Sequence, residues 1–252
     1  MPHKNFLIIA HRGESYYAPE NTYASINLAW ERNDDAVEID IRLTKDEEIV
    51  VIHDKTTLRT GGKFRKISTS DYSELATVNV GKYKGKKWKN EKIPLLDKVI
   101  ETMPKHKYLF VEIKSSAKII KSLQKLFDQK KIKSNQVKFI GFDIDTMKSL
   151  KQTLPKFESY WIIQGKDYKN GADLEVTIRK CRSAGLNGLD VEEKKYLSKE
   201  VIQLVKNSGL KIYTWTVDDP VRAKQLFNDG IDGITTNKAY WIKNKFIEAK
   251  IL

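Results

Sequence analysis

The feature that most constrains this chain is a regular alternation between two apolar patterns. Short runs rich in β-branched residues alternate with longer segments whose apolar residues recur at the 3.6-residue period of a helix. Outside one longer interval, the short runs begin every ~22 to 30 residues, close to the ~30 residues of a β-α-β unit. The pattern therefore predicts a parallel sheet whose strands are joined by helices.

Eight short runs are expected to form strands of this sheet. In a chain of 252 residues, eight strand–helix units favour a closed (β/α)8 barrel, the TIM barrel, which typically takes ~250 residues. An open doubly wound sheet is the alternative fold. We predict the α/β class and one domain over residues 1–252, with strands at 6–11, 36–42, 108–114, 137–141, 160–164, 188–191, 211–217 and 233–236.

The longer interval follows the second expected strand and contains another apolar run, at 49–54. Only a few polar residues precede this run, too few for a parallel crossover, so we expect it to return as the second strand of a β-hairpin. With 45–48 as the turn, Asp40 would lie directly opposite His53.

The segment after the hairpin, at about 55–93, is rich in Gly, Lys and Ser. It contains too few apolar residues to predict a core of its own. We therefore expect a small insertion that lies over one mouth of the barrel.

Chemically active side chains gather at the carboxyl ends of the expected strands, where active sites of such barrels lie. Three of them are acids, and three carboxylates aimed at one mouth would repel one another unless a cation neutralised them. Ligation by oxygen alone suits Mg²⁺ or Ca²⁺. For any single acid, an ion pair with a rim Lys or Arg is the simpler interpretation, but together the three predict one divalent cation bound by Glu38, Asp40 and Glu112.

Two histidines lie beside these acids, His11 at the end of the first strand and His53 on the hairpin. Imidazole exchanges protons near neutral pH, so this pair can act as general base and general acid in a displacement at phosphorus. Arg12 can chelate phosphate oxygens through its planar fork, and Lys114 can supply a compact positive charge.

The positive net charge of the chain favours negatively charged binding partners. Lys and Arg outnumber Asp and Glu by 46 to 33, and the net charge of +13 attracts phosphate-bearing substrates, nucleic acid or anionic membranes. Cys181 is the only cysteine, so no intrachain disulfide can form. No apolar run predicts a transmembrane segment, and the absence of a signal-peptide pattern favours the cytoplasm.

The ordered motifs resemble those of the glycerophosphodiester phosphodiesterase family from end to end. They are I-A-H-R-G at 9–13, P-E-N-T at 19–22, V-E-I-D at 37–40, V-I-H-D at 51–54, V-E-I-K at 111–114, T-W-T-V-D at 214–218 and D-G-I-T-T-N at 232–237. The resemblance implies a barrel with an insertion after the second strand, and hydrolysis of glycerophosphodiesters to glycerol 3-phosphate and an alcohol. It also implies attack by the substrate's own neighbouring hydroxyl, giving a cyclic phosphate that water opens.

Matched motif by motif, the resemblance implies the same histidines, metal ligands, Arg12 and Lys114 as above. It adds Trp215 as the aromatic residue at the glycerol end of the pocket, although barrel packing would also explain this residue. Glu20 is either a residue that orients Arg12 or a histidine, or an acid favoured by the helix dipole. Asn21 is expected to cap the helix that follows.

Two alternatives remain. A lysophospholipase D-like or other specialised phosphodiesterase on the same scaffold would need an apolar groove beside the metal. A nonenzymatic binder of nucleic acid or another polyanion would explain the charge alone, but it would not need the acids and histidines at the strand ends. We expect a small anionic phosphodiester as the substrate and no nucleic acid partner, and the sequence leaves the oligomeric state open.

Overall fold

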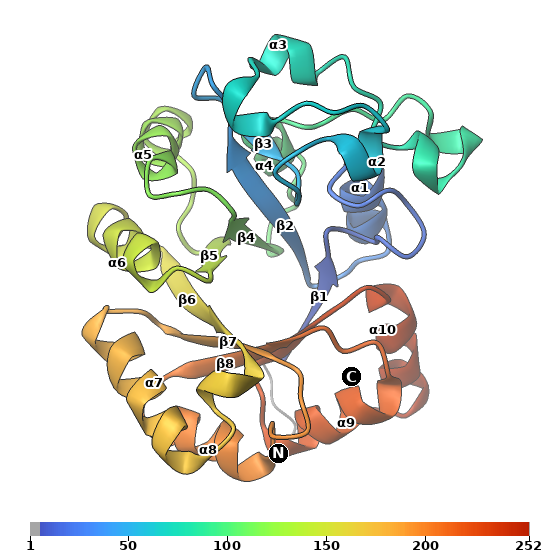
Figure 1. Cartoon of the computed structure of the whole chain (residues 1–252). Helices are drawn as coiled ribbons and strands as arrows, with labels where there is room; N and C mark the ends of the chain where they lie inside the picture. The colour runs from blue at the N-terminus through green and yellow to red at the C-terminus, as the bar shows by residue number, and fades with distance from the viewer. Residues whose placement is uncertain (1–5, 252) are drawn as a thin grey trace.

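The computed structural model of the protein describes residues 6–251, and its central feature is a closed sheet of eight parallel strands. The first strand pairs with both the second and the last, which closes the ring seen in Figure 1. The predicted (β/α)8 barrel is confirmed, and the open sheet is excluded. The barrel strands are β1 (Leu7–His11), β2 (Ala36–Leu43), β4 (Tyr108–Ile113), β5 (Val137–Gly141), β6 (Glu158–Ile163), β7 (Gly188–Glu192), β8 (Lys211–Trp215) and β9 (Gly233–Thr236).

Helices cover the outside of the ring (Figure 1), because their apolar faces pack against the outward-facing strand residues. Thr22, Ser198 and Asp219 cap three of them through their side chains. No helix within 6–251 has the length and apolar character that crossing a bilayer requires. The main helices are α1 (Tyr23–Glu31), α4 (Leu96–Glu101), α5 (Ile119–Lys130), α6 (Ile144–Thr153), α7 (Gly171–Ser183), α8 (Lys199–Asn207), α9 (Pro220–Asp229) and α10 (Ala239–Glu248).

The inside of the barrel is filled by aromatic residues and therefore is not an open channel. The ring centroid of Phe110 lies 5.2 Å from that of Tyr213, which in turn lies 5.0 Å from that of Tyr160. These side chains point inward, so residues two positions later on a strand point inward one layer higher. On β4 this alternation takes Phe110 to Glu112, and it raises the acidic side chains above an apolar floor.

The predicted hairpin is present, but its register differs by one residue. β3 (Ile49–Val51) runs antiparallel to β2 and pairs Leu43 with Ile49, which places Ile52 rather than His53 opposite Asp40. The prediction that Asp40 lies opposite His53 is therefore wrong. The physical reason is a loop shorter than expected, in which Glu47 takes a left-handed φ of 62° and the Thr44 amide N–H donates to the Glu48 carbonyl.

The insertion forms short helical turns beside β3 and α1 (Figure 1). It buries a small apolar cluster that includes Ile67, Leu75 and Val80, together with Val50 and Ile52 of the hairpin. This agrees with the expectation that the insertion has too few apolar residues for a core of its own, because the hairpin completes the cluster. Its turns are α2 (Leu58–Gly61), η1 (Ile67–Thr69), α3 (Tyr72–Leu75), η2 (Lys82–Lys84) and η3 (Lys86–Trp88); a further turn, η4 (Gly165–Asp167), follows β6.

Candidate active site

The predicted acids converge at the carboxyl-end mouth of the barrel. Asp40 on β2 is in register with Glu112 on β4, and Glu38 faces the same way as Asp40. Carboxylate oxygens of the three residues lie within 4.8 Å of one another, and all three side chains are buried. Among the described residues, Glu38 Oε1 has no hydrogen-bond partner. Such a group of oxygens can hold a divalent metal ion.

The pKa values of these acids show the cost of bringing them together. Burial, with the charges of Asp40 and Glu112 nearby, raises the pKa of Glu38 well above its usual range. Burial and Asp40 likewise raise the pKa of Glu112 to about 7. Burial also opposes ionisation of Asp40, but Arg12 and Lys114 outweigh it and hold the pKa of Asp40 below its usual range. A bound cation would favour the ionised form of all three.

Arg12 and Lys114 lie on two sides of Asp40. Arg12 Nε is 3.2 Å from Asp40 Oδ2, and Lys114 Nζ is 3.5 Å from Asp40 Oδ1 and 2.6 Å from Glu112 Oε1. Arg12 has a left-handed φ of 58°, and this turn aims its backbone N–H at Glu38 Oε2, 3.0 Å away. The side chains of Arg12 and Lys114 therefore lie beside the acids, where they could bind the oxygens of a phosphate.

The hydrogen bonds of His11 determine which of its two ring nitrogens carries the proton. Its Nδ1 lies 2.7 Å from Asn237 Oδ1, while the Asn237 amide nitrogen donates to Asp218 Oδ2 at 2.8 Å. Because Asp218 orients the amide, its oxygen faces His11 and accepts the Nδ1 proton. The other nitrogen, Nε2, is 3.9 Å from Glu38 Oε2 and carries no proton when the ring is neutral.

His53 reaches the same cavity from the hairpin, just beyond the end of β3. Its Nδ1 is 2.7 Å from Asp54 Oδ1, and Asp54 Oδ2 accepts a hydrogen bond of 2.6 Å from Arg59 Nε. Burial nevertheless lowers the pKa of His53, and burial with Arg12 lowers that of His11.

Glu20 connects the two histidine regions. Its Oε1 accepts from Arg12 at 2.8 Å, and its two oxygens accept from Arg59 at 2.7 and 2.8 Å. Glu20 thus contacts Arg12 directly and His53 only through Arg59 and Asp54. The insertion supplies Arg59, so it takes part in building this mouth.

Three residues important for the geometry were not identified from the sequence as parts of the site. Arg42 donates to the backbone carbonyls of His53 (2.6 and 2.8 Å) and Lys114 (2.9 Å), which ties the hairpin to β4. The prediction that Asn21 caps α1 is wrong, because Thr22 is the capping residue. Asn21 instead forms hydrogen bonds with both the side chain and the backbone N–H of Asp40. Asn21 and Asn237 lie inside the P-E-N-T and D-G-I-T-T-N motifs, which were the available signals, whereas Arg42 lies in none of the motifs.

A cavity of about 260 Å³ joins these groups. His11 and His53 both line it, with Glu38, Glu112, Arg12 and Lys114. The opposite wall contains Trp215 and Phe142, whose rings meet edge to face at 5.7 Å between centroids. Buried Asp190 lies below them, and its Oδ1 has no hydrogen-bond partner within 6–251. The structure therefore brings every predicted site residue except Glu20 and Asp40 to the cavity wall, and these two touch residues that line it.

Comparison with known proteins identifies the family. Residues 11–240 match the glycerophosphoryl diester phosphodiesterase family. YhdW of Bacillus subtilis (strain 168) is 31% identical over 233 residues, which cover 91% of this chain and 93% of that protein. A glycerophosphodiester phosphodiesterase of Caldanaerobacter subterraneus is 29% identical over 247 residues, covering 92% of this chain and 93% of that protein.

Solved structures give the same result. A phosphodiesterase of Oleispira antarctica, in complex with the product sn-glycerol-3-phosphate, is similar with a TM-score of 0.87 and 26% identity over 96% of both chains. The predicted family and its enzyme class are confirmed. The chain belongs to the glycerophosphoryl diester phosphodiesterase family.

Proposed function

We propose that this protein hydrolyses glycerophosphodiesters to glycerol 3-phosphate and an alcohol, with a divalent cation and two histidines. One observation supports this above all: two imidazoles, two cationic side chains and the buried acids Glu38 and Glu112 line one cavity of about 260 Å³. The product complex of the Oleispira relative supports the same substrate class.

Glu38, Asp40 and Glu112 are the ligands that we propose for the cation. Their oxygens lie close together, and the orphaned Glu38 Oε1 and the raised pKa values of Glu38 and Glu112 indicate a site that is electrostatically incomplete without positive charge. The oxygen-only donor set favours Mg²⁺ or Ca²⁺. When bound, such an ion would polarise the phosphoryl group and acidify an attacking hydroxyl.

The histidines are suited to different halves of the reaction. Neutral His11, with its Nδ1 proton bound to Asn237, has Nε2 free to accept the proton of the substrate's neighbouring glycerol hydroxyl. As that oxygen bonds to phosphorus, the bond to the leaving alcohol breaks and His53, supported by Asp54, gives the leaving oxygen a proton. The product of this half is a cyclic phosphate.

Water then opens the ring with the roles reversed. His53 takes a proton from water as the water oxygen bonds to phosphorus, and His11 returns its proton to the departing glycerol oxygen. The sum is one diester plus one water giving glycerol 3-phosphate and one alcohol. Arg12 and Lys114 would hold the phosphate oxygens, and Trp215 would cover the glycerol carbons.

The test is release of glycerol 3-phosphate from glycerophosphocholine by the purified protein. We expect chelation to abolish it, and His11→Asn or His53→Asn to lower kcat by ~10³-fold or more, since each removes an acid/base group. His106→Asn is the matched control, because His106 is exposed and its left-handed φ of 69° suits asparagine. Full activity in the His11/His53 double variant would refute the assignment.

The lysophospholipase D-like alternative is less well supported. It needs an apolar groove for an acyl chain beside the site, whereas the large groove that adjoins Lys114 has seven basic side chains in its lining. The nonenzymatic polyanion binder does not account for the paired histidines in one cavity.

A further inference from the structure

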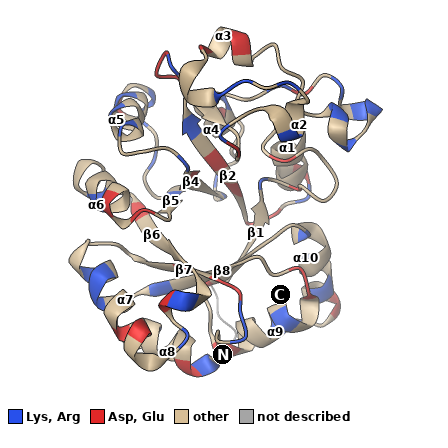
Figure 2. Ribbon diagram, viewed as in Figure 1, with Lys and Arg blue, Asp and Glu red and all other residues tan. Residues whose placement is uncertain are grey.

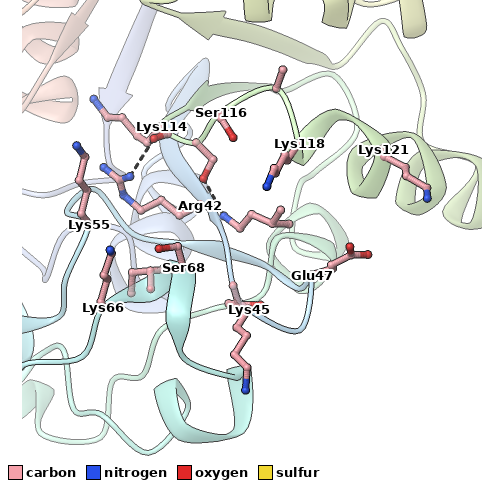
Figure 3. Close-up of a pocket in the computed structure, with 15 residues that line it drawn as sticks. Arg42, Lys45, Glu47, Lys55, Lys66, Ser68, Lys114, Ser116, Lys118 and Lys121 are labelled. Atoms are coloured by element: carbon pink, nitrogen blue, oxygen red, sulfur yellow. Dashed lines mark hydrogen bonds between the residues drawn. The ribbon is translucent and has the colours of Figure 1, made fainter.

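A second, larger hollow lies outside the barrel wall, between the insertion and the start of α5 (Figure 3). We call it the basic groove; its volume is about 830 Å³. The hairpin turn and η1 form one side, and the β4–α5 loop forms the other. Its charged lining consists of one acid, Glu47, and seven basic residues: Arg42, Lys45, Lys55, Lys66, Lys114, Lys118 and Lys121.

Most of this positive charge has no acidic partner. Lys45 pairs with Asp71 at 3.5 Å, and Lys114 pairs with the acids of the active site. Within 6–251, the other four lysines of the groove, Lys55, Lys66, Lys118 and Lys121, form no ion pair. Figure 2 shows acidic segments on β2, and it shows basic segments along the insertion together with an acidic one at α3.

Unpaired like charges repel one another, and a concave surface concentrates their field. Lysines scattered on a convex surface are ordinary solvated groups, but here two segments far apart in sequence face one hollow. Lys55 and Lys66 come from the insertion, and Lys118 and Lys121 come from α5 and the loop before it (Figure 3). The hollow therefore favours a ligand with several negative charges.

The basic groove adjoins the proposed active site. Lys114 lines both hollows, and Lys55 follows His53 by two residues. Arg42 lies at the junction, where it bonds the backbone carbonyls of His53 and Lys114. A molecule that extends from the phosphate position past Lys114 would enter the groove.

The direction of the groove indicates which end of a diester it would receive. Trp215, the proposed cover of the glycerol, is on β8, which is four strands from β4 around the ring in both directions. The groove adjoins β4 and β2 and is thus across the barrel from Trp215. A substrate with glycerol at Trp215 and phosphorus near His11 and His53 would point its leaving group toward the groove.

We propose that the basic groove binds leaving groups that carry further phosphates, so that the preferred substrates are glycerophosphodiesters with a multiply phosphorylated alcohol. The proposal rests on the function proposed above and names its substrate class. The bond that breaks is the same; the extra phosphates are bound and unchanged.

Matched substrates test this proposal. Glycerophosphoinositol and its 4,5-bisphosphate break the same kind of bond, and their leaving groups differ only by two phosphate groups on the inositol ring. Wild type should have a KM for the bisphosphate about tenfold lower at low salt, and added NaCl should remove the difference, since exposed charges are screened. Glycerophosphoglycerol and a glycerol phosphate trimer form a second arm, which distinguishes compact from linear phosphorylated groups.

The groove variant is Lys66→Glu/Lys118→Glu, which reverses one charge on each side. It should raise the KM of the phosphorylated substrates about tenfold and leave kcat and the KM of glycerophosphoinositol within about twofold. The control, Lys148→Glu/Lys224→Glu, makes the same charge change on exposed positions of α6 and α9. An equal rise in KM for both variants, or no preference in wild type in either arm, would overturn the proposal.

A binding measurement separates this result from failure of the proposed function. Calorimetry with inositol 1,4,5-trisphosphate needs no turnover, and the groove variant should bind it about tenfold more weakly than the control does. If no diester is hydrolysed but this difference persists, the reaction is wrong and the groove is a polyphosphate site. If diesters are hydrolysed and the two variants bind the trisphosphate equally, the groove assignment is wrong.

Discussion

The two mouths of the barrel differ in how their acidic side chains are paired. At the amino-end mouth, Glu158 of β6 accepts hydrogen bonds from Lys138, from Lys211 at 2.7 Å and from the Tyr160 hydroxyl at 2.8 Å. At the carboxyl-end mouth, Glu38 and Glu112 face each other and Asp40, and buried Glu38 Oε1 lacks a hydrogen-bond partner among residues 6–251. One mouth is electrostatically complete and the other is not.

This difference separates stability from function on the same set of strands. Charges that are paired and hydrogen-bonded hold neighbouring strands together, whereas buried like charges destabilise the fold until a ligand compensates them. The carboxyl-end mouth should therefore bind cations, because a bound cation relieves the repulsion between the acids. Substitutions at the two mouths should have opposite effects on stability and activity.

The largest expected effect is that of Glu38→Gln at the carboxyl-end mouth. Loss of a proposed metal ligand should lower kcat/KM by ~10³-fold or more, because the cation is held more weakly. The same change should raise the free energy of unfolding in EDTA by ~1 kcal/mol, since it removes a buried carboxyl from two others. Urea unfolding and glycerophosphocholine turnover measure the two quantities. A variant that loses stability in EDTA would show that repulsion is not significant there.

Glu158→Gln is the counterpart at the amino-end mouth, with a smaller effect of the opposite kind. It should lower the free energy of unfolding by ~1–2 kcal/mol, because the buried Lys138 ammonium loses its carboxylate. Turnover should stay within about twofold of wild type, because Glu158 and the active-site residues lie at opposite mouths of the barrel. A tenfold loss of activity in a variant of unchanged stability would contradict the separation of roles.

The sequence was sufficient to predict the barrel strands and the acids, histidines and basic residues that line the carboxyl-end mouth. Strand period and spacing depend on local pattern, and the rule that barrel sites lie at carboxyl ends converts strand ends into a site. His11, Glu38 and Glu112 are strand residues, so their direction follows from alternation once the barrel is assumed.

Contacts made through loops could not be predicted in the same way. The hairpin register depends on the left-handed conformation of Glu47, a residue type that carries no signal for it. Arg42 is one of 46 basic residues, and only the folded chain places it against two carbonyls. Asn21 and Thr22 are both good N-cap residues, and the position of Asp40 decides which of them caps α1.

The smallest predicted effect is the pH dependence of the amino-end mouth. Burial opposes ionisation of Glu158, but hydrogen bonds from Lys138 and Lys211 outweigh it and lower the pKa of Glu158 from 4.5 to about 2. Because the folded-state pKa is depressed, its contribution is full above pH ~4.5 and is lost as pH falls toward ~2. The gap in unfolding free energy between wild type and Glu158→Gln should therefore be constant from pH ~7 to ~5 and shrink by pH ~3.

Glu175→Gln is the control for this measurement, because Glu175 and Arg179 form an exposed ion pair on α7. Such a pair contributes at most a few tenths of a kcal/mol to stability. The unfolding free energy of Glu175→Gln should therefore stay close to that of wild type at every pH. Urea unfolding in EDTA at matched ionic strength compares all three proteins. A Glu158→Gln gap that persists undiminished at pH ~3 would mean that packing, and not the carboxylate charge, stabilises the amino-end mouth.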